Sequence, residues 1–211
     1  MTPTIAVLDY GMGNRRSVEK ALERVGARAK VTRQPDDVRA ADGLVVPGVG
    51  AFPEAMRRLR DGGLDALIRE RLEAGGPVLG ICLGMQLLFE RSSEHEGATG
   101  LGLVPGEVTR LRSDGLRLPH IGWNLVRLRR SSPLSAGLPE ACAFYHVHSF
   151  AARPADDADV LGVAEYGEPF ASLVAVGDAP LFGAQFHPEK SSAHGLRLLE
   201  NFAAICARVA A

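Results

Sequence analysis

The segment GICLG places Cys82 between two glycines. It closes an apolar run, residues 78–81, and leads into residues 83–90, a stretch with helical character, so the cysteine falls at a predicted strand-to-helix turn. In such a nucleophile elbow the strained backbone presents the side chain, and the next N–H, that of Leu83, faces an incoming oxyanion. The alternative is a structural cysteine, since free cysteine often packs as a small hydrophobic residue. The glycines and their context leave both interpretations open.

A histidine and a glutamate stand two residues apart in the segment QFHPEKS, residues 185–191, at the end of the last apolar run. Pro188 favours an extended conformation for His187, and residues two apart in an extended segment point to the same side. We therefore expect His187 to contact Glu189. A carboxylate on one ring nitrogen fixes the tautomer and leaves the other nitrogen free to take a thiol proton. For this segment alone, an incidental pair on a surface loop is an equal alternative, but beside the Cys82 turn the catalytic interpretation is favoured.

A glycine-bearing turn, residues 47–50, follows another apolar run and offers a second oxyanion donor at the backbone N–H of Val49. One such donor lowers a barrier by about 2.7–4 kcal/mol, so two preorganised amides would account for much of a catalytic effect. Without Cys82, the segment would be interpreted as an ordinary strand-to-helix turn.

Other motifs argue against a cofactor or a metal. Gly11 and Gly13 follow the first apolar run, but the third glycine of a dinucleotide-binding pattern would fall at Arg16, so that fingerprint fails. No segment has the glycine-lysine pattern of a phosphate-binding loop, and no cofactor is expected. His146 and His148 have strand spacing without an acidic or cysteine ligand nearby, which favours a pair on a sheet face over a metal site.

The elements around these segments alternate in a way that predicts a mostly parallel α/β sheet. Apolar runs and amphipathic stretches follow one another at residues 5–10, 15–25, 44–46, 51–60, 64–74, 78–81 and 83–90. This rhythm implies right-handed crossovers, helices on both faces and functional loops at the carboxyl ends of the strands. The later β-rich runs predict antiparallel additions to the sheet, before a closing helix; they lie at residues 106–111, 143–150, 160–166, 171–176 and 181–186.

The composition of the chain limits the classes of function that it can have. The chain has 211 residues, of which 46% are hydrophobic and 23% charged, with a net charge of −1 and dispersed basic residues. This profile predicts one domain, residues 1–211, and makes nucleic acid an unexpected partner. Three cysteines are a sparse, odd set that is typical of a reducing compartment. Since the sequence also has no signal peptide and no apolar run of membrane-spanning length, we expect a soluble, cytoplasmic protein.

The segments GICLGMQ, residues 80–86, and QFHPEKS together resemble the class I, or triad, glutamine amidotransferases. The resemblance extends along the whole chain, through DYGMGN at 9–14, PGVG at 47–50, GLGLVPG at 100–106, PHIGWN at 119–124 and YHVHSF at 145–150. The first two segments specify the class. The PGVG and GWN segments resemble the branch of the family that works in histidine biosynthesis.

This resemblance implies a flavodoxin-like fold and a Cys-His-Glu triad, formed here by Cys82, His187 and Glu189. The implied reaction is the hydrolysis of glutamine to glutamate and ammonia through a glutamyl thioester, with oxyanion donors at Val49 and Leu83. The resemblance also implies contacts to glutamine at three positions: Gly50, Gln86 and Ser149.

The implied partner is a (β/α)8-barrel cyclase that uses the ammonia to make imidazole glycerol phosphate and an aminoimidazole carboxamide ribotide. The positions that face this partner in the family match Trp123, Tyr145 and Lys190. Because free hydrolysis would waste glutamine, we expect the partner to gate activity through the turn at Val49. Two positions depart from the family pattern: Arg15 replaces a frequent Leu, and Phe150 replaces a frequent Tyr and so lacks its hydroxyl.

Three alternatives remain open. The chain could be the glutaminase partner of anthranilate or aminodeoxychorismate synthase, against which the PHIGWN segment argues. It could be a stand-alone cysteine peptidase or hydrolase on a similar sheet. It could also be a non-catalytic binding subunit, against which the presence of Cys82, His187 and Glu189 argues.

Overall fold

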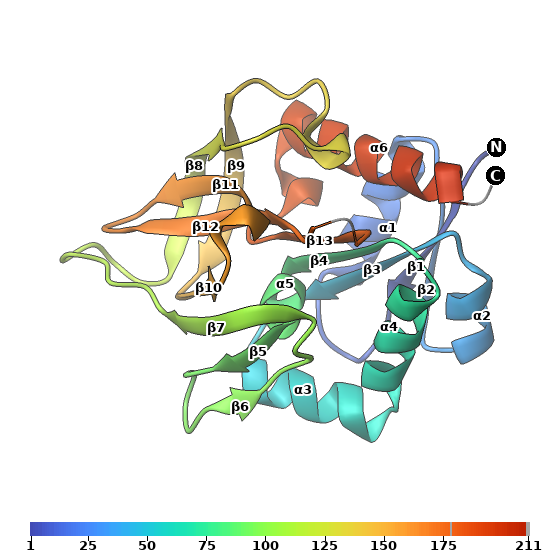
Figure 1. The fold of residues 1–211 in the computed structure, drawn as a ribbon, viewed down its shortest axis with the longest axis horizontal. Coiled ribbons are helices and arrows are strands. Elements are labelled where there is room, and N and C mark those ends of the chain that lie inside the picture. The colour runs from blue at the N-terminus through green and yellow to red at the C-terminus, as the bar shows by residue number, and fades with distance from the viewer. Residues whose placement is uncertain (178, 210–211) are drawn as a thin grey trace.

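Parallel strands form the centre of the structure, a computed structural model that describes residues 1–177 and 179–209 (Figure 1). The last two residues of the predicted domain lie outside the described residues. The first part of the chain contains β1 (Thr4–Leu8), α1 (Arg15–Arg24), β2 (Arg28–Thr32), α2 (Pro35–Ala40), β3 (Gly43–Gly48), α3 (Phe52–Asp61), α4 (Leu64–Glu73), β4 (Val78–Cys82) and α5 (Leu83–Leu87). The rest contains β5 (Phe89–Ser92), β6 (Ala98–Thr99), β7 (Val104–Arg110), β8 (His120–Leu128), β9 (Ala141–His148), β10 (Phe150–Pro154), β11 (Val160–Glu165), β12 (Pro169–Ala175), β13 (Leu181–Ala184) and α6 (Ser192–Val209).

The main sheet has nine strands in the order β2-β1-β3-β4-β13-β12-β11-β8-β9. Its pairs from β2 to β13 are parallel, and the pairs from β13 to β9 are antiparallel. The predicted mostly parallel sheet with antiparallel additions in the C-terminal half is therefore confirmed. In the register, Gly48 lies beside Cys82, and Ala184 beside Ile81, so the segments that follow β3, β4 and β13 leave the sheet at one edge. This edge carries the three segments that the sequence singles out.

Hydrophobic side chains cover both faces of the parallel strands, because alternate residues of a strand point to opposite sides. Ile5 and Val7 pack with α1 and α6 on one face, while Ala6 and Leu8 pack with α2, α3 and α4 on the other. Figure 1 shows the same division, with α6 above the sheet and α3 and α4 below it. The two layers hold the strands that position the site.

Part of the β-rich region forms a second sheet instead of extending the first, which corrects the sequence prediction. Its order is β10-β7-β5-β6, so the predicted run 106–111 pairs with β10 and β5. The helix predicted over residues 83–90 is also too long, since α5 ends at Leu87. The Leu87 carbonyl accepts a hydrogen bond from Leu101, and the Leu88 carbonyl accepts one from Leu103. Pairing with this later segment therefore draws the backbone after Leu87 into β5.

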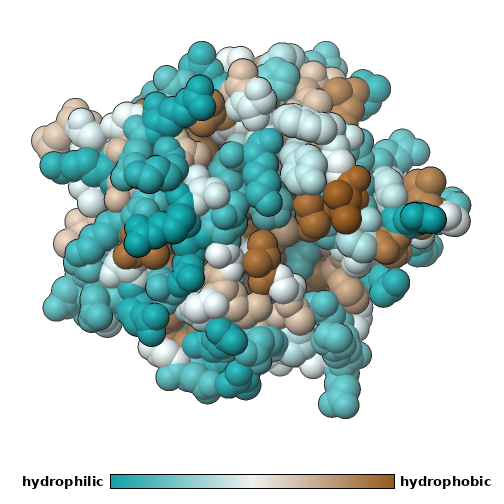
Figure 2. All heavy atoms as spheres, turned by 180° about the vertical axis from the view of Figure 1, so that it is seen from behind, coloured by the Kyte–Doolittle hydropathy of each residue, from teal (hydrophilic) through white to brown (hydrophobic). Residues whose placement is uncertain are grey.

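Polar side chains dominate the molecular face in Figure 2, where hydrophobic ones form small, separate groups. The large exposed hydrophobic side chains include three alternate residues of β8, namely Ile121, Trp123 and Leu125. Among residues 1–177 and 179–209, no helix combines the length and the apolar character needed to cross a membrane.

The close approach of α5 to β3 depends on the missing side chain of Gly84. A Cβ atom at this position would lie 1.8 Å from the Val46 carbonyl oxygen, and rigid backbone cannot move aside easily. We expect Gly84→Ala to lower the free energy of unfolding by about 3 kcal/mol, the upper range for an overpacked site. Urea denaturation measures this change. Gly75→Ala is the control, because Gly75 has a φ of +77° but open space around it, and we expect a loss of about 1–2 kcal/mol there. Equal losses in both variants would contradict the steric explanation.

Candidate active site

Cys82 ends β4 in a strained conformation, with φ 54° and ψ −112°. A residue with a side chain rarely adopts positive φ, and holding it there costs about 1–3 kcal/mol. Gly80 makes the sharp turn possible, since a Cβ atom there would lie 2.6 Å from the Gly84 carbonyl oxygen. The side chain of Cys82 is almost completely buried, and its sulfur lies 3.7 Å from the carbonyl oxygen of Val147. The local geometry is that of the predicted elbow.

His187 and Glu189 are in contact, and both side chains are buried. His187 Nδ1 lies 2.9 Å from Glu189 Oε1, and the backbone N–H of His187 donates to the Tyr145 carbonyl at 2.9 Å. Burial alone would lower the pKa of His187, but hydrogen bonds and charge interactions with Cys82 and Glu189 outweigh it and raise the pKa to about 10. Because Nδ1 faces Glu189, Nε2 is the nitrogen left for Cys82. The arrangement favours a charged imidazolium beside the sulfur.

Asn14 supports Glu189 from the far end of the chain. Its Nδ2 donates to Glu189 Oε1 at 3.1 Å, across 175 positions of the sequence. Glu189 Oε2 is buried and has no hydrogen-bond partner among the described residues. Asn14 therefore supplies the side-chain donor that, together with His187, orients this carboxylate. Sequence reasoning missed Asn14, because no local pattern marks a contact across this separation.

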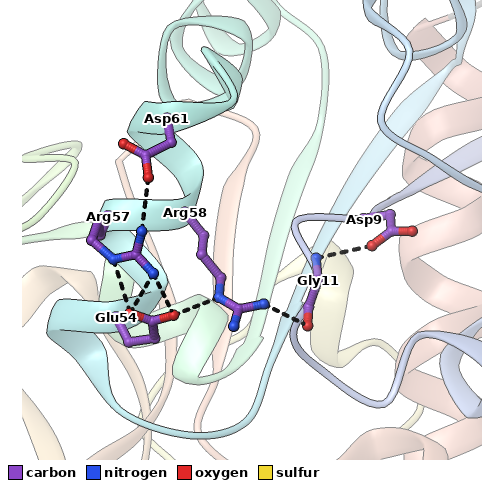
Figure 3. Close-up of polar contacts among 6 residues, drawn as sticks. All are labelled: Asp9, Gly11, Glu54, Arg57, Arg58 and Asp61. Carbon is purple, nitrogen blue, oxygen red and sulfur yellow. Dashed lines mark hydrogen bonds and ion pairs between the residues drawn. The ribbon is translucent and has the colours of Figure 1, made fainter.

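The loop that carries Asn14 is tethered to α3, as Figure 3 shows. Arg58 Nη1 donates to the Gly11 carbonyl at 3.2 Å, and the Gly11 N–H donates to Asp9 Oδ1 at 3.0 Å. Glu54 Oε1 in turn accepts from Arg58 Nε at 2.7 Å. The same figure includes two further members of this network, Arg57 and Asp61. Exposed pairs of this kind contribute little energy singly, but together they limit the movement of the loop.

Arg15, at the start of α1, also binds this loop. Its guanidinium forms an ion pair and a hydrogen bond with Asp9. Burial tends to raise the pKa of Asp9, but the Gly11 N–H and the Arg15 charge outweigh it and lower the pKa below its ordinary value. This contact joins the start of α1 to the loop that precedes it.

A cavity of about 250 Å³ opens over Cys82. Eight residues that the sequence predicted for the site line it: Val49, Gly50, Cys82, Leu83, Gln86, Ser149, His187 and Lys190. Glu189 lies behind His187, while Trp123 and Tyr145 lie outside the cavity lining. Sequence reasoning did not assign Glu94 or His148, which also line the cavity. No pattern around Glu94 marks it, because it lies in an irregular segment after β5.

Three buried histidines, His120, His146 and His148, lie side by side, and His148 is the one that lines the cavity. His148 Nδ1 lies 2.8 Å from the Phe150 carbonyl, which can only accept, so Nδ1 carries the proton and Nε2 accepts from His120 Nδ1 at 3.2 Å. Burial lowers the pKa of His148 to about 3, and it lowers the pKa of His120 and His146 as well. His146 Nε2 lies 2.8 Å from Ser172 Oγ. Within the described residues, no group of three or more His, Cys, Asp or Glu side chains is arranged to hold a metal ion.

The fold and this site together define a class I glutamine amidotransferase. The family described as "Glutamine amidotransferase class-I" matches residues 6–206, and the chain belongs to this family.

Its similarity to individual proteins is more specific. It is 52% identical to the "Imidazole glycerol phosphate synthase subunit HisH" of Moorella thermoacetica over 198 residues, which cover 94% of this chain and 93% of that protein. It is 50% identical to the protein of the same name from Symbiobacterium thermophilum, and the match covers 94% of this chain and 92% of that protein.

Solved structures share the fold. "Structure of PurLQS from Thermotoga maritima" has a TM-score of 0.76 at 19% identity and covers 97% of this chain and 99% of that chain. Another, "Crystal structure of glutamine amidotransferase", has a TM-score of 0.74 at 23% identity, with 96% and 98% covered. These neighbours confirm the predicted fold class.

Because three histidines are buried, we expect the protein to lose stability in weak acid. Their pKa values are lowered on folding, so the unfolded chain binds more protons below pH 6.5, the ordinary histidine value. Stability is therefore present above about pH 6.5 and declines as the pH falls, and the slope due to His148 alone approaches about 1.4 kcal/mol per pH unit as the unfolded side chain becomes fully protonated. The raised pKa of His187 acts in the opposite sense, since its contribution is complete below 6.5 and is lost as the pH rises through about 10.

Urea denaturation between about pH 6.5 and pH 5, above the range in which carboxylates titrate, measures this slope. We expect a shallower slope in His148→Gln than in the unmodified protein. The exposed His95 provides a control, His95→Gln, whose slope should equal that of the unmodified protein. An unchanged slope in His148→Gln would contradict the assignment of a neutral, buried ring.

Asn14→Ala tests the support of Glu189. Losing the hydrogen bond frees the carboxylate to rotate away from His187. We therefore expect the glutaminase kcat to fall about tenfold, with little change in KM. This fall corresponds to the loss of about 1.5 kcal/mol that is usual for a hydrogen bond to a charged group. The kcat of Asn14→Asp should fall further, because a second carboxylate would repel Glu189. Steady-state kinetics on the two purified variants measures both parameters. A KM effect alone would instead assign Asn14 to substrate binding.

Proposed function

We propose that this chain is the glutaminase subunit of an imidazole glycerol phosphate synthase, which supplies ammonia to a (β/α)8-barrel cyclase in histidine biosynthesis. The observation that carries the proposal is the combination of two facts. Proteins with this name are 52% and 50% identical to the chain over 94% of its length. The groups needed for glutamine hydrolysis line one cavity around Cys82 or lie directly behind it.

Hydrolysis begins when Cys82 gives its proton to His187 Nε2 and the sulfur attacks the carboxamide carbon of glutamine. The carbonyl electrons move onto oxygen, where the N–H groups of Leu83 and Val49 stabilise the negative charge. Collapse of this intermediate breaks the C–N bond, and the imidazolium protonates the leaving nitrogen, which departs as ammonia. A water molecule then gives a proton to His187 and attacks the thioester, which releases glutamate and restores the Cys82 thiol. Glu189 orients and stabilises the imidazolium in both halves.

The charges of free glutamine require partners in the cavity. Glu94 supplies a carboxylate for the α-ammonium group, and its Oε2 is held by the Phe52 N–H at 2.7 Å. Gly50, Gln86 and Ser149 offer backbone and side-chain polar groups for the rest of the molecule. This combination favours a free amino acid over a glutamine within a peptide, which lacks the α-ammonium group, and so argues against a peptidase.

The partner docks on the face formed by β8 and β9. Ile121, Trp123 and Leu125 are 59%, 55% and 45% exposed at alternate positions of β8. Trp123 also packs edge-on against Tyr145 of β9, at 6.1 Å between ring centroids. An aromatic and aliphatic surface of this kind is typical of protein interfaces. Residues 147–149, which follow Tyr145 along the chain, line the cavity, so this face adjoins the chemistry.

Lys190 and Val49 extend the contact to the mouth of the cavity, which both residues line. Val49 is 43% exposed, so a docked partner can contact this turn and reorient it to complete the oxyanion hole.

We further propose that residues 1–211 act as one domain and that the protein functions in the cytoplasm without binding nucleic acid. The family match over residues 6–206 supports the first statement. Free thiols at Cys82, Cys142 and Cys206 support a reducing compartment.

Cys82→Ala in the assembled complex tests the function. We expect glutamine-dependent synthesis to fall below detection, while synthesis from added ammonium salt stays within about twofold of the unmodified complex, because the sulfur acts only in ammonia release. Product formation by the cyclase, with glutamine or with ammonium chloride, measures both. Gln34→Ala, at an exposed position, is the control and should retain both activities.

Glutamine-dependent product in Cys82→Ala would remove the nucleophile from the proposal. If the unmodified chain activated an anthranilate or aminodeoxychorismate synthase partner but not the cyclase, the assignment to histidine biosynthesis would be wrong.

A further inference from the structure

We propose that Gln185 is a catalytic residue whose side-chain N–H donates a hydrogen bond to the Cys82 sulfur, in a direction fixed by Gln86. The inference rests on the proposed function, since it concerns the sulfur that attacks glutamine. Gln185 Nε2 lies 3.9 Å from Cys82 Sγ, within hydrogen-bonding range for sulfur, and the residue is completely buried. Its backbone N–H donates to the Ser172 carbonyl at 2.9 Å, directly after β13. The amide therefore reaches the nucleophile from rigid structure.

The polarity of this contact follows from a chain of amides that begins at a backbone carbonyl. The Phe150 carbonyl can only accept, and Gln86 Nε2 donates to it at 2.9 Å. The same Nε2 donates to Gln185 Oε1 at 3.0 Å. The amide of Gln185 then has its nitrogen toward Cys82. Reversing Gln185 would bring two NH₂ groups together, and reversing both amides would bring two oxygens together at Phe150.

The Phe150 carbonyl is itself fixed by a second donor. His148 Nδ1 donates to it at 2.8 Å, and the buried ring stays neutral because burial lowers its pKa to about 3. The start of the amide chain thus keeps its orientation across the range in which His187 works. A neutral amide also leaves the proton exchange between Cys82 and His187 undisturbed, which a charged side chain at position 185 would alter.

The reaction gives this donor a specific task. In the thiol form, the Cys82 S–H can donate to the Val147 carbonyl, at 3.7 Å. Once the proton has passed to His187, the Val147 oxygen faces a negative sulfur that has nothing to donate, and the contact becomes repulsive. The N–H of Gln185 offsets this repulsion, because hydrogen bonds to charged groups are roughly twice as strong as neutral ones. It acts on the attacking sulfur, whereas Leu83 and Val49 act on the substrate oxygen.

The experiment compares the pH dependence of Cys82 alkylation by iodoacetamide in the free subunit, with the labelled cysteine assigned by peptide mass spectrometry. Gln185→Glu keeps an acceptor for Gln86 but replaces the N–H by a second oxygen, and Gln185→Met keeps the size without a donor. We expect both profiles to move upward by about one pH unit or more, with alkylation near pH 7 about tenfold slower. In the complex, kcat should fall by at least about tenfold, with KM changed less than about twofold.

Gln34→Glu, which places the same charge change at an exposed position, should match the unmodified protein. The alkylation profile of Gln185→Met decides between loss of the donor and added charge, because methionine removes the N–H without adding a charge, and thermal unfolding is the check on its fold. Unmoved profiles in the folded variants would overturn the proposal, as would a lower kcat without a shift in alkylation. Because alkylation needs neither glutamine nor cyclase, a failure of the proposed function alone would leave this readout intact.

Discussion

The ending of three parallel strands side by side is the constraint on which the rest of the structure depends. The register sets Gly48 beside Cys82 at the ends of β3 and β4, and β13 runs parallel to β4 on its other side and leads to His187. The turn between β4 and α5 can form only because Gly80 and Gly84 lack side chains where backbone atoms approach. The strain at Cys82 is therefore maintained by packing on both faces of the sheet, and the oxyanion turn, the nucleophile and the base are consequences of strand order.

Similar imidazole rings near this edge have opposite charge preferences because their partners differ. His148 faces a backbone carbonyl and another histidine, and burial keeps its pKa near 3. His187, also buried, faces Glu189 and Cys82, which raise its pKa to about 10. The rings of His148 and its buried neighbours His120 and His146 add no positive charge, and His148 lines the cavity and holds the start of the amide chain. They leave His187 as the ring that favours the charged form, which suits the exchange of one proton with sulfur.

The sequence predicted the features that reside in short segments. The alternation of strands and helices gave the sheet, and the segments around Cys82 and His187 gave the side chains that the fold brings together. Their catalytic roles stay predictions. Contacts between distant segments could not be predicted, since nothing local indicates that Asn14 meets Glu189 or that Gln185 points at the sulfur. The overlong helix has the same origin: the carbonyls of Leu87 and Leu88 pair with residues 101–103, which no local pattern reveals.

The most direct test of the central claim, covalent catalysis at Cys82, is peptide mass spectrometry after rapid acid quenching of the complex during turnover of glutamine. The account predicts a glutamyl adduct on the peptide that contains Cys82, formed before glutamate accumulates and absent from Cys82→Ala. It also predicts no adduct on Cys142 or Cys206, which are buried away from the cavity. Glutamate release at the full rate without an adduct, or equal release by Cys82→Ala, would contradict it.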